Sequence, residues 1–121
     1  MNIRSSFLLL IASVFATPTL SDDQALLTGQ VSVIDGDTIE IHGTRIRLHG
    51  IDAPESGQLC RDWQNQNWRC GQKSALALDK KIGRRPASCT TTGTDRYGRV
   101  IGICTSGGTN LNAWMVQQGW A

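Results

Sequence analysis

Short runs in which apolar and polar residues alternate recur along this chain, and they limit it to a fold built mainly from strands. Residues 26–41 hold two such runs on either side of Asp35-Gly36, a pair typical of a turn or bulge, so we expect a β-hairpin there. A third strand is expected over residues 44–51. It ends before Pro54 because proline cannot donate a hydrogen bond to a sheet.

The second half of the chain adds one central helix and two more strands. The remaining expected elements are a helix over residues 72–82, strands over residues 87–92 and 99–105, and a final helix that begins after Thr109 or Asn110 and ends at Gly119. The order is therefore β-β-β-α-β-β-α. Five strands interrupted by one helix predict a mainly β (β+α) fold, a closed five-stranded barrel of the OB type.

One stretch between the third strand and the helix lacks this regularity. Residues 55–70 show no apolar periodicity and are rich in amide side chains, so we expect a loop. Trp63 and Trp68 lie within it, and we expect both to pack back onto the domain. Stacking of these two rings on nucleic-acid bases is the alternative.

Four cysteines bear on both fold and compartment. Cys60, Cys70, Cys89 and Cys104 are even in number and include no C-x-x-C pair, a pattern typical of disulfides in an exported protein. Three pairings exist. The pairing Cys60–Cys70 with Cys89–Cys104 is favoured because each bridge closes a local loop. A structural zinc site is the alternative, but the long spacings lack paired ligands.

The first residues carry the features of an export signal. Arg4 precedes an apolar run over residues 7–16, which is too short to span a bilayer. We expect residues 1–21 to be a signal peptide, cleaved after Ala16 or Ser21, and residues 22–121 to form the domain; a buried N-terminal helix is the alternative. The mature protein would be periplasmic or secreted, have no membrane span and act as a monomer.

Net charge excludes strong binding to nucleic acid by bulk electrostatics. The chain has 12 Lys and Arg residues against 10 Asp and Glu residues, and loss of Arg4 with the signal peptide brings it close to neutrality. The basic residues form no tail or stripe. Any contact with nucleic acid must therefore rest on a few well-placed arginines.

Two short blocks contain the candidate metal ligands. Asp37 lies at the expected turn and Asp52 at the end of the third strand, so their carboxylates meet if this strand lies beside the hairpin. The main-chain oxygen of Ala53 lies at the same rim. Carboxylate and carbonyl oxygens are the ligands that Ca²⁺ prefers. Glu55, three residues beyond Asp52, is placed to act as a general base on a water in the shell of the ion.

Two arginines would complete a site for phosphodiester chemistry. Arg47 leaves the same strand as Asp52, and Arg99 follows the turn before the last strand. A guanidinium stays charged and matches the oxygens of a phosphate, which suits a transition state that gains negative charge. Each of these residues also has a purely structural interpretation, as a turn, a strand exit or an exposed strand arginine. Their concentration within a few residues favours the functional one.

Four motifs in order resemble the staphylococcal nuclease (thermonuclease) family, whose members are secreted Ca²⁺-dependent enzymes that have an OB-type barrel and cut DNA and RNA. The matching segments are Val33-Ile34-Asp35-Gly36-Asp37-Thr38-Ile39, Arg47 with Ile51-Asp52-Ala53-Pro54-Glu55, Asp95-Arg96-Tyr97-Gly98-Arg99, and Leu111-Asn112 with Met115-Val116 and Gln118-Gly119. The resemblance extends from Leu27 to the C-terminus.

The resemblance implies a role for each matching metal-site residue. Asp37 and Asp52 would be the carboxylate ligands of Ca²⁺, together with the main-chain oxygen of Ala53. Asp35 would be a carboxylate near the shell of the ion. Glu55 would be the general base that activates the attacking water.

The resemblance also implies which residues meet the substrate. Arg47 and Arg99 would grip the scissile phosphate, and Arg96 and Tyr97 would contact a neighbouring terminal phosphate. The product in this family carries a 3′-phosphate, so the 5′-oxygen leaves.

The sequence departs from the family pattern in two places. Cys60 and Cys70 occupy the loop after Glu55, where the founding enzyme has no cysteine. The family continues past Gly119 with a tyrosine-bearing segment and a third helix, whereas this sequence stops at Ala121, so we expect a shortened domain without the third helix.

Three functional hypotheses follow. The leading one is an exported Ca²⁺-dependent nuclease for DNA and RNA. The alternatives are a non-catalytic OB-fold module that binds nucleic acid or nucleotide, and a structural exported domain whose site residues have lost their role.

Overall fold

Strands and two helices make up the part of the chain that the computed structural model describes, residues 11–14 and 25–121. The strands are β1 (Leu26–Gly29), β2 (Val31–Asp35), β3 (Thr38–Ile41), β4 (Thr44–Leu48), β5 (Cys60–Arg61), β6 (Asn67–Trp68), β7 (Ala87–Thr94), β8 (Val100–Ser106) and β9 (Thr109–Asn110). The helices are α1 (Cys70–Ile82) and α2 (Leu111–Gln117). The predicted mixed, mostly β class is confirmed.

One large sheet organises the molecule. Its strands follow the order β1-β7-β8-β4-β3-β2, with β9 paired to β8. The β4–β8 pair is parallel, and the other pairs are antiparallel. The two ends of this order, β1 and β2, are consecutive in sequence with only Gln30 between them. The closed five-stranded barrel stays a prediction.

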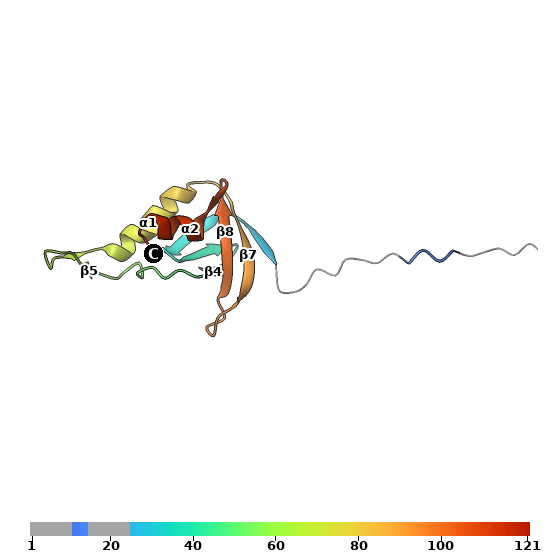
Figure 1. Cartoon of the computed structure of the whole chain (residues 1–121), viewed down its shortest axis with the longest axis horizontal. Helices are drawn as coiled ribbons and strands as arrows, with labels where there is room; N and C mark the ends of the chain where they lie inside the picture. The colour runs from blue at the N-terminus through green and yellow to red at the C-terminus, as the bar shows by residue number, and fades with distance from the viewer. Residues whose placement is uncertain (1–10, 15–24) are drawn as a thin grey trace, which may run out of the picture.

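Both helices pack on the same side of this sheet, as Figure 1 shows. Each helix has an apolar face, because its buried apolar residues are four positions apart: Leu78 and Ile82 in α1, and Leu111 and Met115 in α2. These four side chains join one buried cluster with the inward-facing residues of the strands. The strand residues in that cluster are Ile39, Ile41, Ile46, Leu48, Ala87, Cys89 and Cys104.

Most expected elements are present, with shifted ends. The first hairpin has the expected irregularity, a register shift between Val33 and Asp35, and its first strand is divided into β1 and β2. The third strand stops at Leu48 instead of continuing to residue 51. The final helix is capped by Asn110, whose side chain accepts a hydrogen bond from the Ala113 amide at 3.0 Å.

The loop expected over residues 55–70 contains a small hairpin. Strands β5 and β6 pair through Cys60↔Trp68 and Arg61↔Asn67. Apolar periodicity could not predict these strands, because each has two residues and neither buries a face. The hairpin projects from the body at the left of Figure 1. Trp68 is 37% exposed and Trp63 is 91% exposed, so the expectation that both pack onto the domain is wrong for Trp63.

The structure contains the two favoured disulfides. Cys60–Cys70 ties the small hairpin to the start of α1, and Cys89–Cys104 links residues directly opposite each other on β7 and β8. No free cysteine is present in the described residues. Disulfides of this kind are typical of proteins outside the reducing cytosol.

The expected signal peptide lies, except for residues 11–14, outside the described residues. Neither α1 nor α2, the helices found in the described ranges, is long and apolar enough to cross a membrane.

Candidate functional site

Asp37 is a buried carboxylate in the turn between β2 and β3, only 6% exposed. Its Oδ2 atom accepts a hydrogen bond from the Ala53 amide at 2.8 Å, and its Oδ1 atom accepts one from the Thr38 hydroxyl at 2.9 Å. The bond to Ala53 joins the turn to the segment that follows β4. The two acidic blocks therefore meet, as the sequence predicts.

Arg47 on β4 contacts both candidate ligand carboxylates. Its Nη1 atom lies 2.8 Å from Asp37 Oδ2, and its Nη2 atom donates to Asp52 Oδ1 at 3.2 Å. The Nη1 atom is buried and sits at an angle that gives an ion pair without a directed hydrogen bond. One guanidinium thus pairs with a buried and an exposed carboxylate, since the Asp52 side chain is 91% exposed, and the trio keeps one net negative charge.

Two glycines let the acidic blocks approach α1 closely. A Cβ atom at Gly36 would overlap the hydroxyl of Ser74, and one at Gly71 would overlap the main-chain oxygen of Glu55. A larger residue at either position would push a site segment away from the helix. The glycines hold the site through close packing, which the spacing of charged residues does not reveal.

Asp35 is held by a residue that the sequence interpretation did not single out. Its Oδ1 atom accepts hydrogen bonds from the Ser56 amide at 2.6 Å and from the Ser56 hydroxyl at 2.7 Å. The same hydroxyl contacts the main-chain oxygen of Ile34. These bonds fix Ser56, and so the main chain directly after Glu55, to the end of β2. The position of Ser56 directly after the Asp52–Glu55 block was the signal that could have identified it.

The Glu55 carboxylate has no hydrogen-bond or ion-pair partner among the described residues, and the residue is exposed. Its main chain is well fixed, because the main-chain oxygen accepts from the Gln58 amide at 2.8 Å. A carboxylate that is free on a fixed backbone can accept a proton from a water.

Asp95 organises the tip of the β7–β8 hairpin, where the other predicted substrate contacts lie. Its carboxylate accepts from the amides of Tyr97 and Arg99 at 2.9 Å and pairs with Arg99 Nε at 2.7 Å. Burial raises the pKa of Asp95, but these hydrogen bonds and the Arg99 charge hold the pKa below its usual value. The carboxylate therefore supports the tip until the pH falls through that lowered pKa.

The tip places its cations over an aromatic ring. The guanidinium carbons of Arg96 and Arg99 lie 5.0 Å and 5.6 Å from the centre of the Tyr97 ring, which is 70% exposed. Tyr97 and Arg96 are thus neighbours on the surface, as expected for residues that contact one substrate group.

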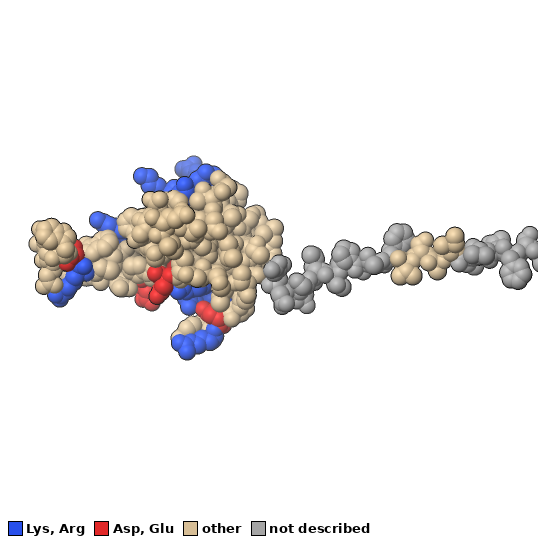
Figure 2. Space-filling model, in the orientation of Figure 1, with Lys and Arg blue, Asp and Glu red and all other residues tan. Residues whose placement is uncertain are grey.

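The two arginines predicted to grip a phosphate come to one face of the sheet but do not touch. Arg47 pairs with Ile101 in the parallel β4–β8 register, and Arg99 lies two residues before Ile101. Alternation along a strand then places both arginines on the same face. Within the described residues no hydrogen bond or ion pair links Arg99 to Asp37, Asp52 or Glu55. In the view of Figure 2, acidic and basic atoms lie side by side along the lower edge of the domain.

The donor set suits a hard cation such as Ca²⁺ in chemistry, although it offers few carboxylates. Asp37, Asp52 and the main-chain oxygen of Ala53 supply only oxygen atoms, as Ca²⁺ prefers. No cluster of three or more His, Cys, Asp or Glu side chains capable of holding a metal occurs in residues 11–14 and 25–121. Any bound ion would need waters to complete its shell.

Asn112 of α2 positions the segment before Asp52 and was noted in the sequence only as part of a motif. Its side chain accepts from the Cys104 amide at 3.1 Å and donates to the main-chain oxygens of His49 at 3.0 Å and Gly102 at 3.1 Å. The residue is 7% exposed. One buried amide thus joins β8, α2 and the chain beyond β4.

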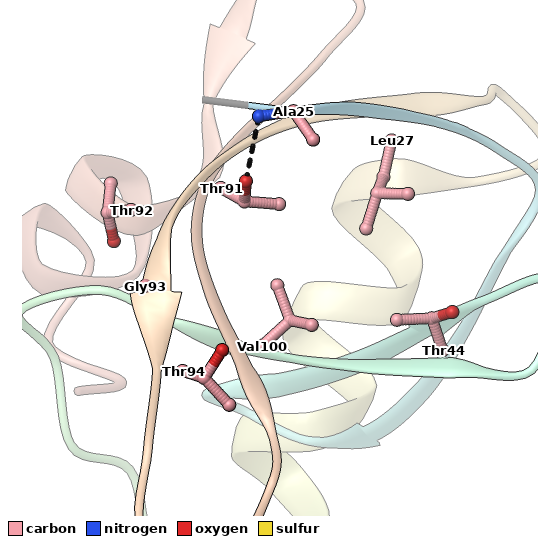
Figure 3. A pocket seen from close by; sticks show the side chains of 8 residues that line it. All are labelled: Ala25, Leu27, Thr44, Thr91, Thr92, Gly93, Thr94 and Val100. Carbon is pink, nitrogen blue, oxygen red and sulfur yellow. Dashed lines mark hydrogen bonds between the residues drawn. The ribbon is translucent and has the colours of Figure 1, made fainter. Parts of the chain in front are cut away.

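A cavity of about 490 Å³ lies away from these charges, between β1, β4, β7 and β8. Figure 3 shows its threonine and apolar side chains and the hydrogen bond from the Ala25 amide to the Thr91 hydroxyl at 3.0 Å. None of its lining residues is charged. It therefore offers no charged side chain to a phosphate.

Comparison with known proteins matches residues 45–121 to the family model described as staphylococcal nuclease homologue. The chain is 43% identical over 114 residues to the succinoglycan biosynthesis protein ExoI of Rhizobium meliloti (strain 1021), covering 90% of this chain and 60% of that protein. It is 36% identical over 104 residues to the micrococcal nuclease of Shigella flexneri, covering 75% of this chain and 54% of that protein. It is 35% identical over 118 residues to an uncharacterized endonuclease of Escherichia coli, covering 93% of this chain and 69% of that protein.

Proposed function

Because the chain belongs to the staphylococcal nuclease family, we propose that it is a Ca²⁺-dependent nuclease that hydrolyses phosphodiester bonds in DNA and RNA. The observation that carries this proposal is the contact of Arg47 with both Asp37 and Asp52, close in sequence to Glu55, whose carboxylate has no partner among the described residues. The candidate phosphate contact Arg47, the two candidate carboxylate ligands and the candidate base thus all lie within residues 37–55.

The residues divide into ion ligands and substrate contacts. Asp37, Asp52 and the main-chain oxygen of Ala53 would hold Ca²⁺, with Asp35 nearby. When bound, the ion would supply Lewis-acid stabilisation of the charge that builds on the phosphate. The donor chemistry and the link between Ala53 and Asp37 support this assignment.

Glu55 would act as the general base. It accepts a proton from a water whose oxygen attacks phosphorus, the bond from phosphorus to the 5′-oxygen breaks, and the 5′-oxygen leaves and takes up a proton from solvent. The products are a 3′-phosphate and a 5′-hydroxyl. Arg47 and Arg99 would donate to the phosphate oxygens as charge develops.

Arg47 has to give up one carboxylate to reach the phosphate. Its link to the exposed Asp52, at 3.2 Å, is the weaker one, because exposed ion pairs contribute little. Its contact with buried Asp37 can stay and hold the guanidinium in place. Arg96 and Tyr97 would contact a neighbouring phosphate from the hairpin tip.

We further propose the domain boundaries, the compartment and the oligomeric state of the protein. Residues 1–21 would be a signal peptide and residues 22–121 an OB-type domain, closed where β1 continues into β2 at Gln30. The protein would be exported to the periplasm or secreted, as the two disulfides favour, and would act as a monomer.

A non-catalytic module that binds nucleic acid or nucleotide is the second candidate. It is favoured by the absence, in the described residues, of a cluster of three or more His, Cys, Asp or Glu side chains that could hold a metal ion. The chain spans 60% and 54% of the lengths of the first two relatives reported above.

A nuclease assay on the disulfide-bonded protein separates these candidates. We expect cleavage of single-stranded DNA that needs Ca²⁺, stops with a chelator and returns when Ca²⁺ is added back. Glu55→Gln should lower the rate by roughly 10²- to 10⁴-fold, because it removes the base. Glu40→Gln on β3 is the matched control and should keep the rate, since Glu40 pairs with Arg45 outside the site. Binding without cleavage would favour the module.

A further inference from the structure

The β5–β6 hairpin exposes a large aromatic ring that does nothing for its own fold. Trp63 lies at its tip with 91% of its surface exposed. The tip is held by polar contacts alone: the Asp62 carboxylate accepts from the amides of Gln64 and Gln66, both at 2.9 Å, and Arg61 donates to the Asn65 side chain at 2.9 Å. The Trp63 ring is therefore free to bind a partner.

The hairpin is cross-linked at its base and hydrogen-bonded near its tip. The Cys60–Cys70 disulfide closes its base, and the main chains of Asp62 and Gln66 are joined by a 2.9 Å hydrogen bond. An aromatic ring on a fixed support loses little conformational entropy when it binds. This arrangement is that of a recognition surface.

A pocket connects the hairpin to the proposed active site. It has a volume of about 250 Å³, and its lining includes Asp52, Trp68 and the Cys60–Cys70 disulfide. The Lys73 ammonium group lies 5.7 Å from the centre of the Trp68 ring. A polymer bound at Asp52 could thus continue along the base of the hairpin.

The charges of this region favour an anionic polymer. Residues 58–73 carry Arg61, Arg69 and Lys73 against one acidic residue, Asp62, whose carboxylate is used inside the tip. The excess positive charge lies at the base of the hairpin, where Arg69 and Lys73 begin α1, because Arg61 and Asp62 balance within the hairpin itself. Exposed tryptophans beside basic side chains are the features that bind unpaired bases and their phosphates.

We propose that the β5–β6 hairpin is a stacking platform for single-stranded nucleic acid, with Trp63 stacking on an unpaired base beyond the bond to be cut. The proposal rests on the proposed nuclease function and adds a second binding surface to it. Stacking requires a base whose face is open, so the platform would prefer single strands to duplex.

Equilibrium binding tests the platform without cleavage. A fluorescein-labelled oligothymidine and a labelled duplex of equal length are titrated, with a chelator present, against Glu55→Gln protein with and without Trp63→Ala. We expect Trp63→Ala to weaken single-strand binding by about 5- to 100-fold. Duplex binding should change by less than about twofold, because paired bases offer no open face.

Two matched variants serve as controls for this measurement. Trp63→Phe keeps an aromatic face and should retain most of the affinity. Leu76→Ala removes another exposed apolar side chain, 57% exposed on α1 and not part of the lining of the 250 Å³ pocket, and should leave binding unchanged. The unfolding midpoint of Trp63→Ala should equal that of its parent, since the ring supports no contact in the tip.

The proposal is overturned if Trp63→Ala binds the single strand as tightly as its parent, or if it loses single strand and duplex equally. Binding of an anionic oligosaccharide that depends on Trp63, without binding of the oligonucleotide, would also overturn it. Cleavage by the unsubstituted protein with Ca²⁺ is measured separately. An active nuclease whose binding ignores Trp63 refutes the platform alone, whereas an inactive protein refutes the proposed function.

Discussion

Two aspartates that touch the same guanidinium have different parts in the molecule because they differ in burial. Asp37 is 6% exposed and also accepts from the Ala53 amide and the Thr38 hydroxyl. The Asp52 side chain is 91% exposed and has Arg47 as its sole hydrogen-bond partner among the described residues. Asp37 therefore holds the site together, and Asp52 is free to exchange partners.

This difference predicts unequal costs for two otherwise matched substitutions. Asp37→Ala should lower the free energy of unfolding by about 3–5 kcal/mol, because it leaves the buried Nη1 of Arg47 without its counter-charge. Asp52→Ala should cost less than about 1 kcal/mol, as exposed ion pairs do. Urea unfolding with a chelator present measures both, so that ion binding does not contribute. Equal costs would refute the structural role given to Asp37.

At the scale of elements, the start of α1 and the chain after β4 fix each other. Gly71 in the first turn of α1 is buried against the main-chain oxygen of Glu55, and Ser56 is bonded to Asp35 on β2. The side chain of the candidate base Glu55 is thus exposed, whereas its main chain is held in place. The start of α1, which lies 15 residues after Glu55 in the sequence, therefore limits where the Glu55 carboxylate can point.

A methyl group at Gly71 should therefore disturb the site. In Gly71→Ala the new Cβ atom overlaps the Glu55 oxygen, so the segment must shift, and we expect a loss of about 1–3 kcal/mol in stability. Misplacement of the base should lower the cleavage rate by about 10²-fold.

Gly57→Ala is the matched control for this prediction. A Cβ atom at Gly57 would meet no atom within 4 Å, although the residue lies only two positions beyond Glu55. Both variants are compared by thermal unfolding and by cleavage of the same substrate. If Gly71→Ala behaves like Gly57→Ala, the helix does not position Glu55.

At the scale of the whole molecule, the two disulfides act on different parts. Cys89 and Cys104 are fully buried and join β7 to β8 within the core. Cys60–Cys70 closes the separate two-stranded sheet β5–β6, which projects from the body in Figure 1. One bridge stabilises the domain, and the other orders a binding surface.

Removal of each bridge should separate these effects. Replacing Cys89 and Cys104 by Ala should cost about 3 kcal/mol of global stability, the amount expected for a loop of this length. Replacing Cys60 and Cys70 by Ala should cost less in urea unfolding of the main sheet, but should make the hairpin a site of proteolytic cleavage in the folded protein. Mapping the cleavage sites tests this. A hairpin that resists protease without its disulfide would contradict the prediction.

Features that depend on neighbouring residues were predictable from the sequence. The mixed, mostly β class, the central helix, a cap at Thr109 or Asn110 and the favoured pairing of the cysteines all follow from local periodicity, capping chemistry or short loop closure, and the structure places the cap at Asn110. The approach of Asp37 to the Ala53 segment also follows, because a strand beside a hairpin brings their ends together.

Only the tertiary structure decided the contacts between distant segments. The sequence could not reveal the double contact of Arg47, the support of Glu55 by Gly71, or the buried bridge made by Asn112. These contacts depend on sheet register and on the space left between a helix and a strand, neither of which leaves a periodic pattern. The exposure of Trp63 has the same origin: the sequence determined that a tryptophan lies in this segment, and polar contacts among its neighbours decided that its ring faces solvent.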